Sequence, residues 1–160
     1  IGATFIQLAR LMGARVTSSE LLPRRREMAL DLGAVEAVDP TAVDLKSRFG
    51  YAFDRVIVAT ASVPATEQTF DLVRAGGSLL FFSGYLKGST LNMQLNDVHY
   101  RELHIHGSID CTIQDYQNAV SLLPQLRMGE LVSDIFSLGD TAQGFLATRN
   151  PEAIKVVVEP

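Results

Sequence analysis

The chain has 160 residues, of which 47% are hydrophobic and 20% charged, and its formal net charge is -4. That length suits one domain with a substantial core, and the apolar fraction excludes a disordered tail or linker. The negative charge argues against a nucleic-acid-binding protein, which needs a basic face. The single cysteine, Cys111, excludes a disulfide framework and a cysteine-based zinc site within these residues.

The first fourteen residues predict an amphipathic helix rather than a signal peptide, because they carry no charged leader. No apolar run approaches the roughly 18 residues that a membrane span needs, and we expect a cytoplasmic protein. The chain starts at Ile1 inside or beside a helix. This start suggests an excerpt of a longer protein.

Helical and strand patterns alternate along the chain. Helices are expected at residues 3–12, 23–32, 64–74, 96–101, 113–127 and 140–148, with a further helical turn after Pro40. Strands are expected at residues 14–20, 36–38, 55–60, 78–84, 103–108, 131–136 and 153–158. Residues 89–95 alternate and could form an edge strand. This alternation predicts an α/β fold with a doubly wound parallel sheet of the Rossmann type, an architecture that binds nucleotides.

Glu20 is the last residue of the strand predicted at 14–20. An acidic residue at the end of the second strand of a dinucleotide-binding fold accepts hydrogen bonds from the adenosine ribose. Glu20 lies 18 residues after Gly2, close to the usual spacing of about 20 from the glycine-rich turn. A solvated glutamate at a strand end is the structural alternative.

Three arginines, Arg24, Arg25 and Arg26, open the next predicted helix. Cations at a helix N-terminus oppose the macrodipole, so they suit a site beside an anionic ligand such as an adenosine phosphate. The alternative is a solvated basic patch paired with Glu27 and other acids. Arginines attract the 2′-phosphate of NADP whereas Glu20 repels it, and the position of Glu20 favours NAD.

Small residues stand at the ends of two predicted strands, Thr60 and Ala61 at the end of 55–60 and Ser83 and Gly84 at the end of 78–84. Ligands of open α/β sheets bind outside the carboxyl ends of the strands, so a cofactor could approach the backbone here. Ordinary turns would use the same residues.

The histidines give little support for a metal site. His104 and His106 share one face of a predicted strand, but no carboxylate or thiolate at metal-motif spacing accompanies them. Cys111 has no neighbour that marks it as a nucleophile.

Six segments follow one another along the chain: IGATFIQLARLMGA, RVTSSELLPRRREMALDLGA, FDRVIVATAS, LVRAGGSLLFFSG, HYRELHIHGSIDCTIQDYQNAV and AIKVVVEP. In this order they resemble the cofactor domain of the medium-chain zinc-dependent alcohol and polyol dehydrogenases, in the branch with sorbitol- and threonine-type enzymes. The first is similar to the end of the family's G-x-G-P-I-G turn and the helix after it. The resemblance covers nearly the whole chain.

The resemblance implies cofactor-binding roles for named residues. Gly2 would be the third glycine of the fingerprint, Glu20 the ribose-binding acid, and Arg25 a residue near the adenosine. Toward the nicotinamide, the implied residues are Thr60, Ala61 (where the family has glycine), Ser83, Gly84, and Ser108 to Asp110. No residue of the chain would be catalytic or bind a metal.

The resemblance also implies what lies outside residues 1–160. The chain would be one dinucleotide-binding domain lacking its first strand and the first two fingerprint glycines. Zinc would be bound by an absent N-terminal domain, toward which residues 150–160 would return as a strand.

Three hypotheses follow. The leading one is the NAD-binding part of an enzyme that moves a hydride between an alcohol or polyol and the nicotinamide, the isolated chain being inactive. The second is the cofactor domain of a zinc-free quinone or enoyl reductase that uses NADPH. The third is a non-catalytic assembly module. In the enzyme or in the assembly module, residues 89–95 could pair across a two-fold axis and form a homo-oligomer.

Overall fold

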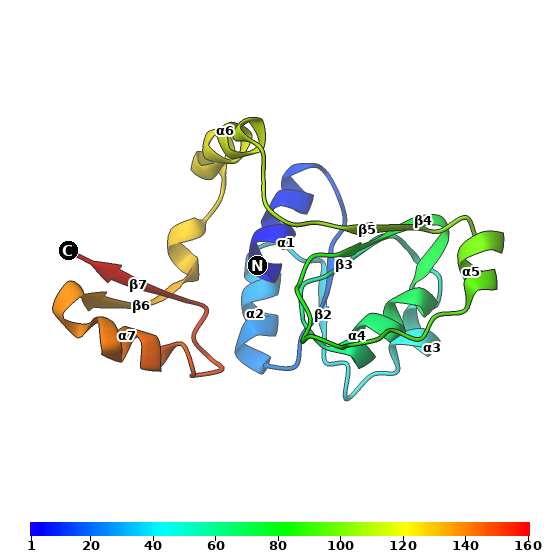
Figure 1. Cartoon of the computed structure of the whole chain (residues 1–160), viewed down its shortest axis with the longest axis horizontal. Helices are drawn as coiled ribbons and strands as arrows, with labels where there is room; N and C mark the ends of the chain where they lie inside the picture. The colour runs from blue at the N-terminus through cyan, green and yellow to red at the C-terminus, as the bar shows by residue number, and fades with distance from the viewer. The chain divides into compact units, whose positions relative to one another are not determined.

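A computed structural model describes residues 1–160 as an α/β chain with parallel strand pairs throughout (Figure 1). The chain forms two compact units. Unit 1 comprises Ile1–Pro40 and Thr112–Pro160, and unit 2 comprises Thr41–Cys111. None of its helices is long and apolar enough to cross a membrane.

The amino-terminal part of unit 1 alternates helix and strand. Its elements are α1 (Gly2–Leu11), β1 (Thr17–Ser19), α2 (Pro23–Asp31) and β2 (Glu36–Val38), and β1 pairs with β2 in parallel. Pro23 begins α2 at the position where its missing N–H leaves no helical hydrogen bond unmade. The core of the unit joins both helices to the carboxyl-terminal part through Ile6, Ala29, Leu32, Ala34 and Leu131.

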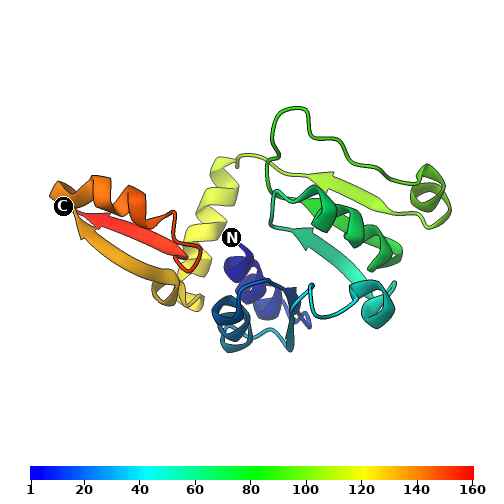
Figure 2. The same ribbon diagram turned by 90° about the horizontal axis from the view of Figure 1, so that it is seen from below.

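The carboxyl-terminal part of unit 1 contains α6 (Ile113–Leu122), the 3₁₀ turns η2 (Leu123–Gln125) and η3 (Met128–Leu131), and β6 (Val132–Ser137). The 3₁₀ turn η4 (Leu138–Asp140), α7 (Thr141–Ala147) and β7 (Lys155–Glu159) complete it. β6 and β7 form a separate parallel pair, and α7 lies along both strands (Figure 2).

Unit 2 contains a three-stranded parallel sheet in the order β3–β4–β5. Its elements are α3 (Leu45–Phe49), β3 (Phe53–Val58), α4 (Val63–Gln68), η1 (Thr69–Asp71), β4 (Val73–Phe81), α5 (Leu95–Tyr100) and β5 (His104–Gly107). The core is built on the central strand, where Val73 and Leu79 are fully buried beside Phe70 and Leu103.

The predicted α/β class and all seven predicted main strands are confirmed, with shifted ends. The sheet is divided into three pieces, because β1 pairs only with β2 and β3 only with β4. One edge of each of these strands therefore has no strand partner. The prediction of a single incomplete domain over residues 1–160 stays a prediction.

The strand predicted at 78–84 begins earlier, at Val73, so Gly76 and Gly77 lie within β4. Gly76 has a positive φ of 67°, and a Cβ on Gly77 would meet the Val73 side chain at 2.5 Å. Only glycine fits this irregular stretch, where the register with β3 shifts. The helix predicted at 64–74 consequently ends at Gln68.

The predicted edge strand at 89–95 is also wrong. Residues 82–94 lie outside helices and strands, and Leu95 begins α5. The Asn92 amide donates to the Glu67 carboxylate, so a side chain satisfies a group that a strand neighbour would otherwise bind. The two-fold pairing expected of this segment therefore has no strand to build on.

Candidate functional site

Unit 2 brings six of the predicted site residues to one edge of its sheet. The register places Val58 opposite Phe81 and Phe81 opposite Gly107, so β3, β4 and β5 end at the same level. The residues that follow these strand ends are Thr60, Ala61, Ser83, Gly84, Ser108 and Asp110. The carboxyl edge, as we call these six residues, is where parallel sheets of this class bind ligands.

The carboxyl edge is open and polar. Thr60, Ala61, Gly84, Ser108 and Asp110 are exposed. A Cβ built on Gly84 would meet no atom within 4 Å, so a ligand can reach the backbone there. Asp110 has a positive φ of 61°, and its carboxylate accepts the Cys111 amide at 2.9 Å, which turns the chain sharply after β5. The arrangement suits binding through backbone and hydroxyl groups.

Two unpredicted contacts tether the segment after β4 to α4. The Tyr85 hydroxyl lies 2.6 Å from the Thr66 hydroxyl, and the Asn92 amide donates to Glu67 at 3.2 Å. A lone loop tyrosine carries no motif, so nothing in the sequence pattern signals either contact.

Glu20 lies directly after β1 in unit 1. Its amide donates to the Val38 carbonyl at 3.0 Å, which extends the pairing of β1 with β2. One carboxylate oxygen accepts the Leu22 amide at 3.0 Å and shapes the turn into α2. Its other oxygen has no hydrogen-bond donor from the chain, so the half-buried carboxylate can still accept from a ligand.

Gly2 is the first residue of α1 and is exposed. A Cβ added to Gly2 would meet no atom within 4 Å. This leaves space for a ligand at the beginning of the helix.

The three arginines lie in three different environments. Arg26 donates to the carbonyls of Glu20 and Leu21 and pairs with Asp39 at 3.2 Å, so it closes the turn between β1 and α2. Its acidic partner is thus Asp39, so Arg26 fits the alternative of a basic patch paired with acids of the chain. Arg24 is exposed.

Arg25 binds the segment that precedes β7. Its Nη2 donates to the carbonyls of Pro151 and Ala153, the latter at 3.0 Å, while its Nε is buried without a partner. The guanidinium therefore links α2 to a chain segment 126 residues further on. That Arg25 packs near the adenosine stays a prediction.

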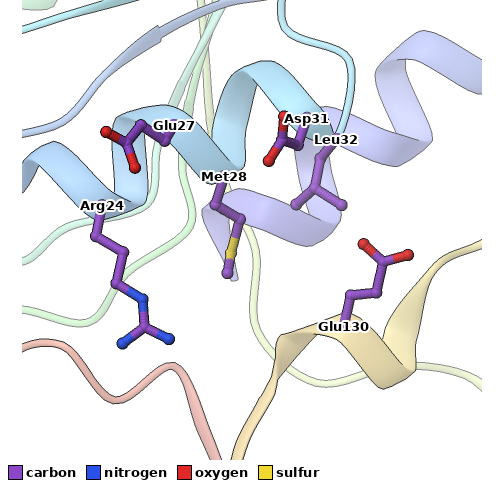
Figure 3. Close-up of a pocket in the computed structure, with 6 residues that line it drawn as sticks. All are labelled: Arg24, Glu27, Met28, Asp31, Leu32 and Glu130. Atoms are coloured by element: carbon purple, nitrogen blue, oxygen red, sulfur yellow. The ribbon is translucent and has the colours of Figure 1, made fainter.

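A shallow hollow of about 240 Å³ lies beside α2 in unit 1 (Figure 3). It is lined by Arg24, Glu27, Met28, Asp31, Leu32 and Glu130. In Figure 3 the Glu130 side chain faces the hollow from η3, opposite α2. None of the predicted site residues lines it, and the pairing of Arg127 with Glu130 at its rim is an ordinary surface ion pair.

The shifted pKa values arise from surface contacts. Hydrogen bonding to Arg74 lowers the pKa of Asp54, and hydrogen bonding to Glu130 raises the pKa of Arg127. Both pairs hold surface segments and lie outside the predicted site.

Zinc does not fit the residues present. No group of three or more His, Cys, Asp or Glu side chains could hold a metal ion. His104 and His106 stack with ring centroids 6.3 Å apart, and Cys111 is a free, exposed thiol. We therefore assign no metal chemistry to this chain.

Parallel α/β units with small and polar residues at the strand ends define the Rossmann class of proteins. Residues 1–125 match the family model for zinc-binding dehydrogenases, and the chain belongs to that family. It corresponds to the carboxyl-terminal portion of the family's members.

Curated relatives support this assignment. The chain is 27% identical to a sorbitol dehydrogenase of Halalkalibacterium halodurans over 169 aligned residues, covering 100% of this chain and 49% of the relative. It is 29% identical to an L-galactonate-5-dehydrogenase of Escherichia coli, covering 84% of this chain and 40% of the relative. The chain thus spans about half the length of the curated relatives it matches.

A solved structure shares the fold. This chain superposes with a TM-score of 0.91, at 26% sequence identity, on a Sinorhizobium meliloti protein described as a zinc-binding dehydrogenase. That structure was determined with bound NADP. The match covers 100% of this chain and 49% of that chain.

Proposed function

We propose that the chain is the dinucleotide-binding part of an NAD-dependent alcohol or polyol dehydrogenase. The bound nicotinamide supplies hydride transfer to or from an alcohol carbon. The family match over residues 1–125 carries this proposal, and the carboxyl edge of unit 2 supports it. The alcohol class is taken from the names of the curated relatives, and a cytoplasmic location belongs to the same proposal.

The chain's own residues bind and orient the cofactor. In unit 1, the oxygen of Glu20 that has no partner accepts from the adenosine ribose, and Gly2 leaves room at the beginning of α1. In unit 2, Ser83 and Gly84 would bind the nicotinamide ribose, together with Thr60 and Ala61 of the carboxyl edge. Ser108 and Asp110 would bind the carboxamide. None of these groups transfers a proton, so the isolated chain binds cofactor and turns nothing over.

The choice between NAD and NADP rests on Glu20. A carboxylate that accepts ribose hydroxyls repels a 2′-phosphate, which favours NAD. NADP is the second candidate, because the Sinorhizobium meliloti relative was solved with it and because Arg24 is exposed nearby in the chain. Zinc in the proposed enzyme is held by residues outside this chain.

Titration of the purified chain with NADH and, separately, NADPH tests the proposal by cofactor fluorescence. We expect saturable binding of both reduced cofactors, with NADH the tighter. Tighter NADPH binding would reverse the cofactor assignment. Failure of both to bind would leave the non-catalytic module as the better description, and measurable alcohol oxidation by this chain would contradict its assignment as a binding part only.

A further inference from the structure

We propose that Tyr85 is a positioning residue for the nicotinamide half of the cofactor. Its hydroxyl fastens the segment carrying Ser83 and Gly84 to α4, the helix that follows Thr60 and Ala61. This inference rests on the proposed function, since it assumes that the carboxyl edge holds the nicotinamide.

The direction of the Tyr85–Thr66 hydrogen bond follows from the partners of Thr66. The Thr66 hydroxyl donates to the Ser62 carbonyl at 2.9 Å, and a carbonyl can only accept. Its one proton is therefore in use, so the Tyr85 hydroxyl donates to Thr66 Oγ1 across 2.6 Å. Because Thr66 is only 1% exposed, water cannot readily replace Tyr85 as its donor.

This pair of hydroxyls connects two strand ends of the same sheet. Ser62 caps α4, since its Oγ accepts the Ala65 amide at 3.3 Å, and it directly follows Ala61. Tyr85 directly follows Gly84. The bonded series from Tyr85 through Thr66 to Ser62 thus fixes the backbone after β4 relative to the backbone after β3.

A second tether limits how far the segment can move. The Asn92 amide donates to Glu67 one residue beyond Thr66, so the stretch between Tyr85 and Asn92 is held at both ends. Between the tethers residues 86–90 are exposed, and only Leu91, next to the second tether, packs against the core of unit 2. The Tyr85 hydroxyl therefore holds Ser83 and Gly84 in place before a ligand arrives, which lowers the ordering cost of binding.

Four forms of the chain test this role: wild type, Tyr85→Phe, Thr66→Val and the double variant, with Tyr116→Phe as the matched control. Tyr116 is 65% exposed on α6 and makes no hydrogen bond through its hydroxyl. NADH probes the whole cofactor, and AMP probes the adenosine half alone. Loss of one hydrogen bond should weaken NADH binding about fivefold in Tyr85→Phe.

We expect AMP affinity to be unchanged in Tyr85→Phe, the double variant to be no weaker than the Thr66→Val variant, and the control to match wild type. Equal weakening of AMP and NADH would overturn the inference, because it would report general destabilisation. Multiplicative losses in the double variant would also overturn it, because the two hydroxyls would then act separately. Thr66→Val removes a second hydrogen bond as well, so Tyr85→Phe carries the comparison if that variant folds poorly.

Hydrogen exchange separates this inference from the proposed function. The Ser89 amide donates to the Leu86 carbonyl at 3.0 Å within the tethered stretch. Without cofactor, its exchange should be about fivefold faster in Tyr85→Phe than in wild type. If wild type binds NADH and Tyr85→Phe binds it equally well, the inference alone fails. If wild type binds no dinucleotide, the proposed function fails and the inference with it.

Discussion

Replacing Arg25 with Met should release the segment before β7 from α2. In the structure the guanidinium donates to the carbonyls of Pro151 and Ala153. Methionine keeps an apolar stem of similar reach but donates no hydrogen bond. The substitution therefore removes the two bonds while leaving Ile154 packed on the core of unit 1.

The size of the effect follows from the two bonds. A hydrogen bond that involves a charged group contributes roughly 1.5–3 kcal/mol. Arg25 is only half-buried and Pro151 is exposed, so water replaces part of what is lost. A net loss of about 2 kcal/mol for the pair corresponds to an opening equilibrium about 30-fold more favourable.

Amide hydrogen exchange at Ile154 measures this opening. That amide donates to the Ser133 hydroxyl at 3.1 Å and lies next to the released carbonyls. We expect exchange about 30-fold faster in Arg25→Met. Arg24→Met is the matched control, because Arg24 is exposed on the same helix and makes no hydrogen bond.

Unchanged exchange at Ile154 in Arg25→Met, or an equal acceleration in Arg24→Met, would show that Arg25 does not hold the segment before β7. The same variant also tests the role predicted from the sequence. A loss of AMP affinity without faster exchange would assign Arg25 to the adenosine rather than to the segment before β7.

Three further predictions concern other parts of the chain. Glu20→Gln keeps an acceptor for the Leu22 amide but removes the negative charge. NADH affinity should therefore fall about tenfold, and NADPH affinity should fall less. An equal loss of both affinities in parallel titrations would contradict the role of Glu20 in binding the adenosine ribose. Hydrogen bonding to Thr112 lowers the pKa of Asp115 from the ordinary aspartate value of 3.8. The capping box therefore stabilises the first turn of α6 fully at pH values above 3.8, and this stabilisation is lost as the pH falls through the lower pKa of the folded chain. NMR of the Asp115 amide should show fraying of the turn only in that acidic range, and Thr112→Ala should abolish the pH dependence. Leu79→Ala leaves a cavity at a fully buried site of β4, and its free energy of unfolding in denaturant should drop by about 2–5 kcal/mol, whereas a loss below about 1 kcal/mol would mean that this core is not packed as described.

The sequence pattern predicts elements where local signals and burial agree. Pro23 locates the beginning of α2, and the apolar run at 55–60 locates β3 to within two residues. The end of β1 is predicted to within one residue, so Glu20 lies where the strand ends, as expected. These features depend on residues near one another in the chain.

The pattern fails where a distant partner decides the structure. Residues 89–95 alternate as a strand does, but the Asn92 amide bonds to Glu67, 25 residues earlier. The partners of Arg25 lie 126 and 128 residues away. The arginine cluster therefore suggests a bound phosphate from the sequence alone, whereas in the structure Arg25 binds backbone carbonyls. The Tyr85–Thr66 pair is invisible for the same reason.

Hydrogen exchange measured with and without saturating NAD will show whether the predicted residues of both units bind a nicotinamide dinucleotide. We expect slower exchange in two separate places, the turn at Glu20 and, within the carboxyl edge, Ser83, Gly84, Ser108 and Asp110. Slowing confined to the hollow beside α2, or none at all under saturating NAD, would contradict it.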